Sequence, residues 1–196
     1  MRILHVILLL LSLSPSPSIA ANKPALESAA PAPYSTTIKG KLDKVVDGDT
    51  IRIEGHKESF RMYGIDAAEK KQPCLKTKGE EQKDVMYGEV ATDFLKSEIL
   101  DDYVDTIITC KFNNKDRYGR PLATCSAKND IYSDINLNKL MVFRGRAFAD
   151  KKYANDAEYL KLEDIAKKNQ WGMWGNGIKC ESPAEFRKIK KQGEER

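Results

Sequence analysis

Two carboxylates flank a glycine in the segment Asp47-Gly48-Asp49, which lies between two runs of β-branched residues. At a junction between strands, carboxylate and backbone oxygens can converge on a hard divalent cation. Asp-Gly is also an ordinary turn sequence, so on this segment alone a turn is the favoured interpretation. The segment lacks the pattern of an EF-hand loop, because the acidic ligand at the far end of that loop is absent.

Two further pieces carry charged residues in a pattern that suits phosphate chemistry. A predicted strand carries Arg61, and its end leads through Asp66 to Glu69. A later polar turn, Asp-Arg-Tyr-Gly-Arg, places Arg117 and Arg120 on either side of a tyrosine. Taken singly, these are ordinary solvated charges. Together they match the needs of a phosphodiester, because two arginines and a cation neutralise its anionic oxygens while a carboxylate manages a proton.

Composition narrows the chemistry. The chain has 196 residues, and its 41% hydrophobic content is enough for the core of one domain. Lys and Arg total 33 against 29 for Asp and Glu, a net charge of +4, so a polyanion must be held by a local site. The two histidines are His5 and His56, and His5 lies in a segment predicted to be removed. Mechanisms that need two histidines are therefore excluded.

The N-terminus has the pattern of a secretory signal peptide. Arg2 supplies a positive charge, residues 3–13 form an apolar run too short for a membrane span, and small residues follow up to Ala20. We predict a signal peptide at residues 1–20 and a flexible lead-in at 21–34, with an uncleaved anchor as the alternative. The mature protein is predicted to be secreted or periplasmic and not associated with a membrane.

The elements that must position the charged residues can be predicted from periodicity. Short β-branched runs at residues 36–39, 50–54 and 59–63 predict three consecutive antiparallel strands. Residues 80–97 then change to a helical period and predict a helix with one face packed on the strands.

The second half of the chain predicts a hairpin and two more helices. Residues 104–112 and 121–127 are extended, with a polar turn at 113–120 between them. A short helix is predicted from 135 to 144, closed by a glycine, and a last helix from 155 to about 169. Five short strands with interspersed helices indicate a small β-barrel.

Four cysteines in a chain predicted to be exported favour two disulfides over a metal site. Cys110 and Cys125 lie on the two arms of the predicted hairpin, and counting back from its turn places them on neighbouring strands, close enough for contact. This pairing leaves Cys74 to pair with Cys180. The alternatives are that Cys74 and Cys180 stay free, or that Cys74 pairs with a hairpin cysteine.

Five pieces of the sequence, in order, resemble the staphylococcal nuclease (thermonuclease) family. They are the Asp-Gly-Asp-Thr junction, the spacing of the strand arginine and the two loop acids, the Asp-Arg-Tyr-Gly-Arg turn, the stretch 140–147 with its glycine, and the final helix ending in Gly-Met-Trp-Gly. The resemblance covers residues 36–175. It implies an α+β fold with a five-stranded oligonucleotide-binding-type β-barrel and three helices, in a nuclease domain at 35–176.

The resemblance implies a calcium-dependent phosphodiesterase site. Asp49 and Asp66 would ligate Ca²⁺ through their carboxylates, and Ala67 through its backbone carbonyl. Many members of the family have Thr-Pro where this chain has Ala67-Ala68, but a carbonyl ligand does not depend on the side chain. Glu69 would orient or deprotonate the attacking water.

The remaining site residues would contact the substrate. Arg61 and Arg120 would clamp phosphate oxygens, since a guanidinium can bind them bidentately. Arg117 and Tyr118 match turn positions that contact a further phosphate in the family. Tyr153 is a candidate platform for base stacking, with a packing role as the alternative.

We therefore predict a monomeric calcium-dependent nuclease with DNA and RNA substrates and little sequence preference. The alternatives are a catalytically silent binding module for nucleic acid or protein and a structural calcium module. Both are disfavoured because neither requires Arg61, Glu69 and Arg120 together with the two aspartates. Residues 177–196 are predicted to be a basic tail, which either adds nonspecific affinity for nucleic acid or is a disordered solubilising segment.

Overall fold

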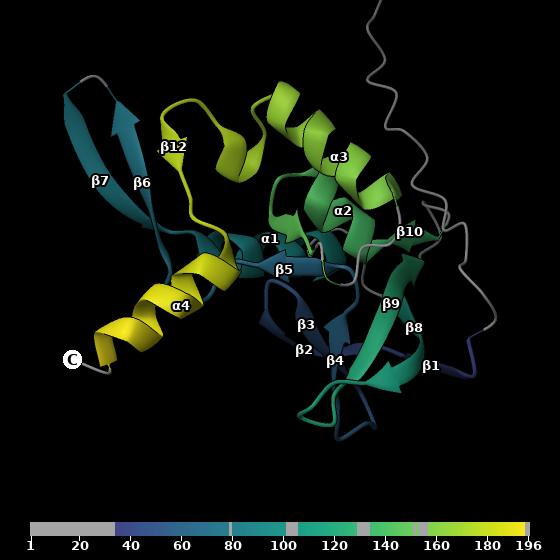
Figure 1. Cartoon of the computed structure of the whole chain (residues 1–196). Coiled ribbons are helices and arrows are strands. Elements are labelled where there is room, and N and C mark those ends of the chain that lie inside the picture. The colour runs from purple at the N-terminus through teal and green to yellow at the C-terminus, as the bar shows by residue number, and fades with distance from the viewer. Residues whose placement is uncertain are drawn as a thin grey trace, which may run out of the picture.

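The computed structural model (Figure 1) describes residues 34–78, 80–100, 106–128, 134–150, 152 and 157–194. The predicted signal peptide, all but the last residue of the predicted lead-in, and Tyr153 lie outside the described residues. Within the described part, no helix is both long enough and apolar enough to cross a membrane. The helices are α1 (Tyr87–Leu100), α2 (Leu137–Phe143), α3 (Ala157–Lys168) and α4 (Pro183–Glu194), with a 3₁₀ turn η1 (Gly172–Trp174).

The largest sheet has seven strands in the order β1-β8-β9-β4-β3-β2, with β10 paired to β9. Neighbours are antiparallel except for the parallel pair β4 and β9. Lys41 alone separates β1 from β2, so the chain connects the two edge strands of this order directly, and the sheet is curled (Figure 1). Its strands are β1 (Thr36–Gly40), β2 (Leu42–Asp47), β3 (Thr50–Ile53), β4 (Ser59–Met62), β8 (Ile107–Lys115), β9 (Pro121–Lys128) and β10 (Ile135–Asn136).

Two smaller sheets adjoin the curled sheet. One pairs β5 (Ile65–Ala67) with β11 (Ala147–Ala149), and the other has the order β12-β6-β7. The strands of the latter are β6 (Pro73–Lys78), β7 (Glu81–Met86) and β12 (Ile178–Lys179). The α+β class matches the prediction. The described residues form twelve strands and four α-helices, and a closed barrel of five strands is not confirmed. Among the short strands, β5 pairs with β11 and β12 pairs with β6, both distant in sequence, whereas β6 and β7 form a local hairpin.

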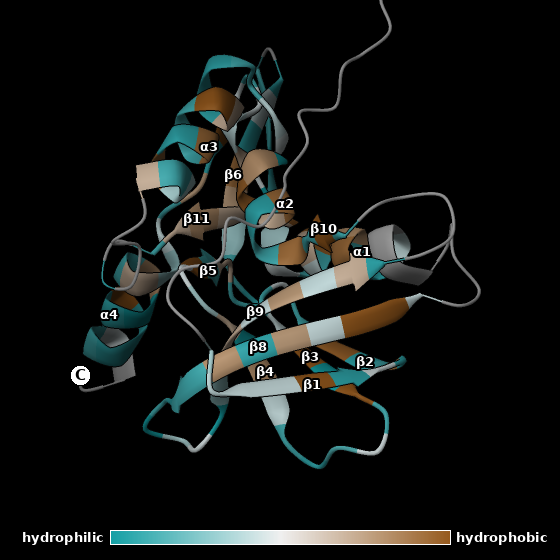
Figure 2. Ribbon diagram, turned by 90° about the vertical axis from the view of Figure 1, so that its right-hand side faces the viewer, coloured by the Kyte–Doolittle hydropathy of each residue, from teal (hydrophilic) through white to brown (hydrophobic). Residues whose placement is uncertain are grey.

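The hydrophobic core lies between the curled sheet and the helices α1 and α2. Ile51 and Phe60 of the sheet, Leu95 of α1 and Met141 of α2 are each at most 1% exposed and belong to one cluster. Figure 2 shows apolar residues on α1 and β11, whereas α4 is mostly hydrophilic. A second, smaller cluster of Ala68, Cys74, Tyr87 and Met173 lies beside β6. The two clusters hold the segment after β5 between them.

The predicted helix begins later than expected. Residues 81–86 form strand β7, which pairs with β6 in register from Pro73 opposite Met86 to Lys78 opposite Glu81. The helical period is therefore realised only from Tyr87 onward, where Ala91 and Leu95 are buried in the core and form the predicted packed face. Backbone hydrogen bonds to β6 override the local helical preference of this segment.

Within the predicted basic tail, the described residues up to 194 form strand β12 and helix α4. Strand β12 pairs with β6, and α4 begins with a capping box in which Ser182 and Glu185 exchange hydrogen bonds, with Pro183 in the first turn. The Ser-Pro-Ala-Glu sequence carried this signal.

Both predicted disulfides are present. Cys110 and Cys125 are directly opposite each other on β8 and β9 and are joined by one disulfide. The other joins Cys74 of β6 to Cys180, which directly follows β12. The second disulfide fixes the C-terminal segment next to the loop that contains Glu69.

Candidate active site

One open cavity of about 800 Å³ collects the charged residues of the three sequence pieces. It lies where the turn between β2 and β3, the loop after β5 and the turn between β8 and β9 meet. Helix α4, far away in sequence, adds one wall. The predicted site residues that line it are Asp49, Arg61, Asp66, Ala67, Glu69, Arg117, Tyr118 and Arg120.

Asp49 is the most deeply buried carboxylate of the cavity. Its Oδ2 accepts a 2.8 Å hydrogen bond from the backbone N–H of Ala67, and its Oδ1 accepts one of 3.0 Å from the Thr50 hydroxyl. Gly48 permits this approach, because a Cβ there would lie 2.7 Å from the Cβ of Ala67 and 2.8 Å from that of Ala91 in α1. The Asp-Gly-Asp sequence therefore forms a turn that also delivers a carboxylate into the cavity.

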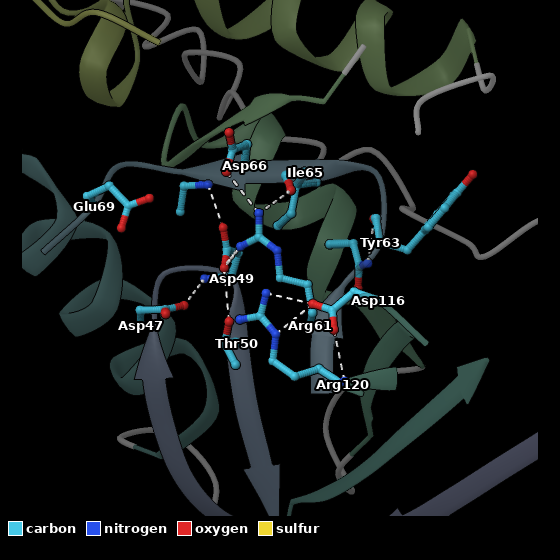
Figure 3. Close-up of polar contacts among 12 residues, drawn as sticks. Asp47, Asp49, Thr50, Arg61, Tyr63, Ile65, Asp66, Glu69, Asp116 and Arg120 are labelled. Carbon is cyan, nitrogen blue, oxygen red and sulfur yellow. Dashed lines mark hydrogen bonds and ion pairs between the residues drawn. The ribbon is translucent and has the colours of Figure 1, made fainter. Parts of the chain in front are cut away.

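Arg61 connects the two aspartates (Figure 3). Its guanidinium forms an ion pair with Asp49 and a second, at 2.8 Å, with Oδ1 of Asp66. The carbonyl of Ile65 accepts a further hydrogen bond of 3.4 Å from Nη2. Strand β4 presents Arg61 toward the cavity, and β5, held by β11, presents Asp66. The arginine is thus positioned by the acids proposed as metal ligands.

Glu69 lies in a loop whose backbone is held from two sides. Its N–H donates a 3.1 Å hydrogen bond to Oε1 of the buried Gln72, and its carbonyl accepts one of 2.8 Å from the N–H of Gln72. Helix α1 supports the loop from behind, because a Cβ on Gly88 would lie 2.2 Å from the Glu69 carbonyl oxygen. The side chain of Glu69 remains 45% exposed, so water can reach its carboxylate.

Arg120 is oriented by Asp116, a residue that the sequence reasoning did not single out. Oδ2 of Asp116 accepts from Nε of Arg120 at 2.8 Å, and its Oδ1 accepts from the backbone N–H groups of Arg120 and Tyr118. Burial acts to raise the pKa of Asp116, but these hydrogen bonds outweigh it and hold the pKa below its ordinary value. Asp116 is the first residue of the Asp-Arg-Tyr-Gly-Arg turn, and an acid four residues before an arginine could have indicated this contact.

The other two substrate candidates of this turn lie at the surface. Tyr118 is 68% exposed, and the guanidinium of Arg117 lies 4.8 Å from the centroid of its ring. The guanidinium of Arg120 lies 5.5 Å from the same centroid. Two cations thus lie close to the exposed ring at the rim of the cavity, an arrangement that suits contact with a polyanion.

Arg187, on α4, also lines the cavity, and the sequence analysis did not identify it as a site residue. Its guanidinium contacts Oε1 of Glu69 at 2.7 Å and Oδ2 of Asp66 at 2.7 Å. Hydrogen bonding to Asp66, followed by that to Glu69, raises the pKa of Arg187 above its ordinary value despite partial burial. The sequence contained no signal for this contact, because residues 66 and 187 are 121 positions apart.

The donor set fits a hard divalent cation in its chemistry. Asp49, Asp66 and Glu69 line one cavity and offer only oxygen ligands, which Ca²⁺ prefers. Within the described residues, no three acidic, histidine or cysteine side chains are arranged as a ligand group. The guanidinium groups of Arg61 and Arg187 bind the oxygens of these carboxylates and provide the compensating positive charge.

Comparison of the sequence with known proteins identifies a family. The sequence model described as "Staphylococcal nuclease homologue" matches residues 59–176. An uncharacterized endonuclease of Escherichia coli O157:H7 is 30% identical over 141 residues, which cover 71% of this chain and 78% of that protein.

Two further relatives extend the comparison. Protein ParB of Escherichia coli is 32% identical over 153 residues, 74% of this chain and 77% of its own length. Endonuclease YhcR of Bacillus subtilis strain 168 is 28% identical over 168 residues, which are 82% of this chain but 13% of that protein. The match to the family model, the similarity of these relatives and the cavity together lead to one assignment. The chain belongs to the staphylococcal nuclease family.

Proposed function

We propose that this protein is an exported, calcium-dependent nuclease that hydrolyses phosphodiester bonds of DNA and RNA with little sequence preference. The observation that carries the proposal is the meeting of Asp49, Asp66 and Glu69 with Arg61 and Arg120 in one cavity. Such a cavity offers oxygen ligands, a candidate base and cationic partners for phosphate. Relatives named endonucleases support the same reading.

Asp49, Asp66 and the carbonyl of Ala67 are the proposed ligands of the cation. Bound Ca²⁺ would polarise the phosphoryl group and offset its charge. Asp49 is well suited to a fixed ligand position, because the Ala67 N–H and the Thr50 hydroxyl hold its two oxygens in place. Asp66 is 7% exposed and is fixed by the short strand β5.

Glu69 is the proposed base. Its carboxylate is exposed to solvent at the edge of the cavity, while Gln72 and α1 fix its backbone. A water molecule between Glu69 and the phosphorus would give up its proton to the carboxylate as the new P–O bond forms and the bond to the leaving oxygen breaks. No histidine is needed for this step.

Arg61 and Arg120 are the proposed phosphate clamp. Guanidinium groups bind phosphate oxygens bidentately and stabilise the charge that increases in the transition state. Each is oriented in advance by carboxylates, Arg61 by Asp49 and Asp66, and Arg120 by Asp116. Arg117 and Tyr118, at the rim, are proposed to contact a neighbouring nucleotide. Tyr153 keeps its proposed stacking role without structural support.

Export is proposed from the signal-peptide pattern at residues 1–20, which lies outside the described residues. The two disulfides are compatible with it, since disulfides persist in oxidising compartments. Secretion from the cell and retention in a periplasm are both consistent with these features. A monomer remains our expectation.

The experiment that tests the function incubates the mature protein with plasmid DNA and with RNA, in Ca²⁺ or in EDTA. We expect cleavage in the presence of Ca²⁺ and none in EDTA. The cleavage rate of Glu69→Gln is expected to be lower by about 100-fold or more. The matched control is Glu54→Gln, an exposed turn carboxylate outside the cavity. Cleavage in EDTA, or full activity of Glu69→Gln, would contradict the mechanism, and calcium-dependent binding without cleavage would favour the silent binding module.

A further inference from the structure

Helix α4 places a cation directly on the carboxylates proposed to bind Ca²⁺ and to act as base. Two nitrogens of the Arg187 guanidinium face Asp66, with Nη2 at 2.7 Å from Oδ2 and Nη1 at 3.3 Å from Oδ1. The same Nη1 lies 2.7 Å from Oε1 of Glu69. One guanidinium therefore bridges the two carboxylates in the fork geometry that arginine uses for bidentate binding.

This contact is incompatible with the proposed chemistry. An oxygen lone pair that accepts a hydrogen bond from Arg187 is not available to a metal ion, and a base paired with a guanidinium is a poor proton acceptor. Arg61 already occupies Oδ1 of Asp66 at 2.8 Å, so Arg187 takes the second oxygen of the same carboxylate. Arginines thus contact both carboxylate oxygens of Asp66.

The position of α4 is fixed by several contacts rather than by Arg187 alone. The disulfide between Cys74 and Cys180 joins the C-terminal segment to β6, and β12 pairs with β6 beside it. Nε2 of the fully buried Gln72 donates a 2.7 Å hydrogen bond to the carbonyl of Glu181, while its Oε1 accepts from the N–H of Glu69. Figure 1 shows α4 beside β5, in agreement with these contacts.

These attachments set a high local concentration of the guanidinium. A group joined to its partner through a rigid segment binds intramolecularly, with an effective concentration far above that of a free ion. Only the side chain of Arg187 needs to move to leave the carboxylates, since its side chain is 47% exposed. The Arg187 guanidinium therefore binds the carboxylates strongly, yet it can leave them by a rotation of its own side chain.

We propose that Arg187 is a resident counter-ion of the cation site, which Ca²⁺ must displace from Asp66 and Glu69 before Glu69 can act as a base. The proposal rests on the calcium-dependent function proposed above. The competition lowers the calcium affinity of the protein by the cost of breaking the two ion pairs. It also keeps the carboxylates from repelling one another when no cation is bound.

The test is a calcium titration of the full mature protein by isothermal titration calorimetry, without substrate. Arg187→Gln is expected to bind Ca²⁺ about tenfold more tightly than the wild type, the low end of what charge-assisted hydrogen bonds contribute. Arg187→Lys, which keeps the charge but lacks the fork, is expected to lie between the two.

The matched control is Lys188→Gln, which removes one positive charge from the neighbouring exposed position of α4. It accounts for the general effect of charge, and its affinity is expected to stay near that of the wild type. Thermal melting and circular dichroism check that each variant is folded. If helix α4 unfolded in Arg187→Gln, the proposal would be tested by the calcium affinity of Arg187→Lys, which is expected to exceed that of the wild type.

The outcomes separate the two proposals. Equal calcium affinity in the wild type, Arg187→Gln and Arg187→Lys would refute the competition and leave the proposed nuclease intact. The same holds if Lys188→Gln gains as much affinity as Arg187→Gln, since a general charge effect would then suffice. Absence of calcium binding in every protein would refute the calcium-dependent function and the competition with it.

Discussion

The carboxylate of Asp116 makes three polar contacts with Arg120. Its Oδ2 lies 2.8 Å from Nε and 2.7 Å from Nη2 of the guanidinium, and its Oδ1 lies 2.9 Å from the backbone nitrogen of the same residue. A flexible side chain is thereby held in one orientation at the cavity before any substrate binds. Such advance orientation lowers the entropy that a phosphate clamp loses on binding.

Replacing Asp116 by asparagine tests this arrangement. The variant keeps the size of the side chain but loses the charge and one bidentate acceptor, so we expect kcat/KM to fall about 10- to 100-fold, as for a misplaced catalytic group. The control is Glu58→Gln, because Glu58 contacts Lys115 of the same hairpin at 3.8 Å and does not line the cavity. Unchanged kcat/KM in Asp116→Asn would show that Arg120 needs no such partner.

The same residue predicts a pH dependence of stability. Because the folded protein holds the pKa of Asp116 below its ordinary value of 3.8, its carboxylate contributes stability above that value. The contribution is lost as the pH falls through the lower, folded-state pKa. Urea unfolding of the wild type and Asp116→Asn should therefore differ by a constant amount near neutral pH and converge in acid. A difference that grows as the pH falls would contradict this sign.

Arg61→Lys tests the bidentate role of the other clamp residue. Lysine keeps the charge but cannot contact Asp49, Asp66 and a phosphate with a planar fork, so we expect activity to fall about 100-fold or more. The control is Arg52→Lys on the neighbouring strand β3, whose ion pair with Asp43 lies outside the cavity. Wild-type turnover in Arg61→Lys would refute the clamp.

Gly88→Ala tests whether α1 positions Glu69. The new Cβ would lie 2.2 Å from the carbonyl oxygen of Glu69, so the loop must move and we expect both activity and melting temperature to fall. Gly193→Ala is the matched control, since its Cβ would meet nothing within 4 Å and alanine favours a helix. Melting curves and cleavage rates should change in Gly88→Ala and stay level or improve in Gly193→Ala.

The two disulfides are expected to differ in their contribution to stability. They close segments of 106 and 15 residues, so the chain-entropy argument assigns about 5 kcal/mol to Cys74–Cys180 and about 3 kcal/mol to Cys110–Cys125. Urea unfolding of the two double alanine variants measures the difference. A larger loss for the Cys110–Cys125 pair would indicate that native packing, and not chain entropy, dominates.

The residues that meet in the cavity were predicted from short sequence pieces and their resemblance to the family, and spacing placed each of them on a local element. Arg61, Asp66 and Glu69 lie within nine positions on a strand and the loop that follows it, and Asp49 and Arg120 lie in turns that their own sequences specify. The hairpin disulfide followed from the same reasoning, because positions equally far from a turn face each other. Spacing was sufficient to place each residue on its local element, whereas the grouping of the residues into one site followed from the family resemblance.

Pairing between segments, some neighbouring and some distant in sequence, decided the rest. Residues 81–86 have a helical period, but β6 offers them hydrogen bonds that an isolated segment does not have, so they became a strand. Arg187 came to Asp66 because the Cys74–Cys180 disulfide, the β12–β6 pairing and Gln72 carry α4 back to the cavity. Contacts between segments more than 100 residues apart depend on the whole fold, since their energies become available only once the intervening chain is packed.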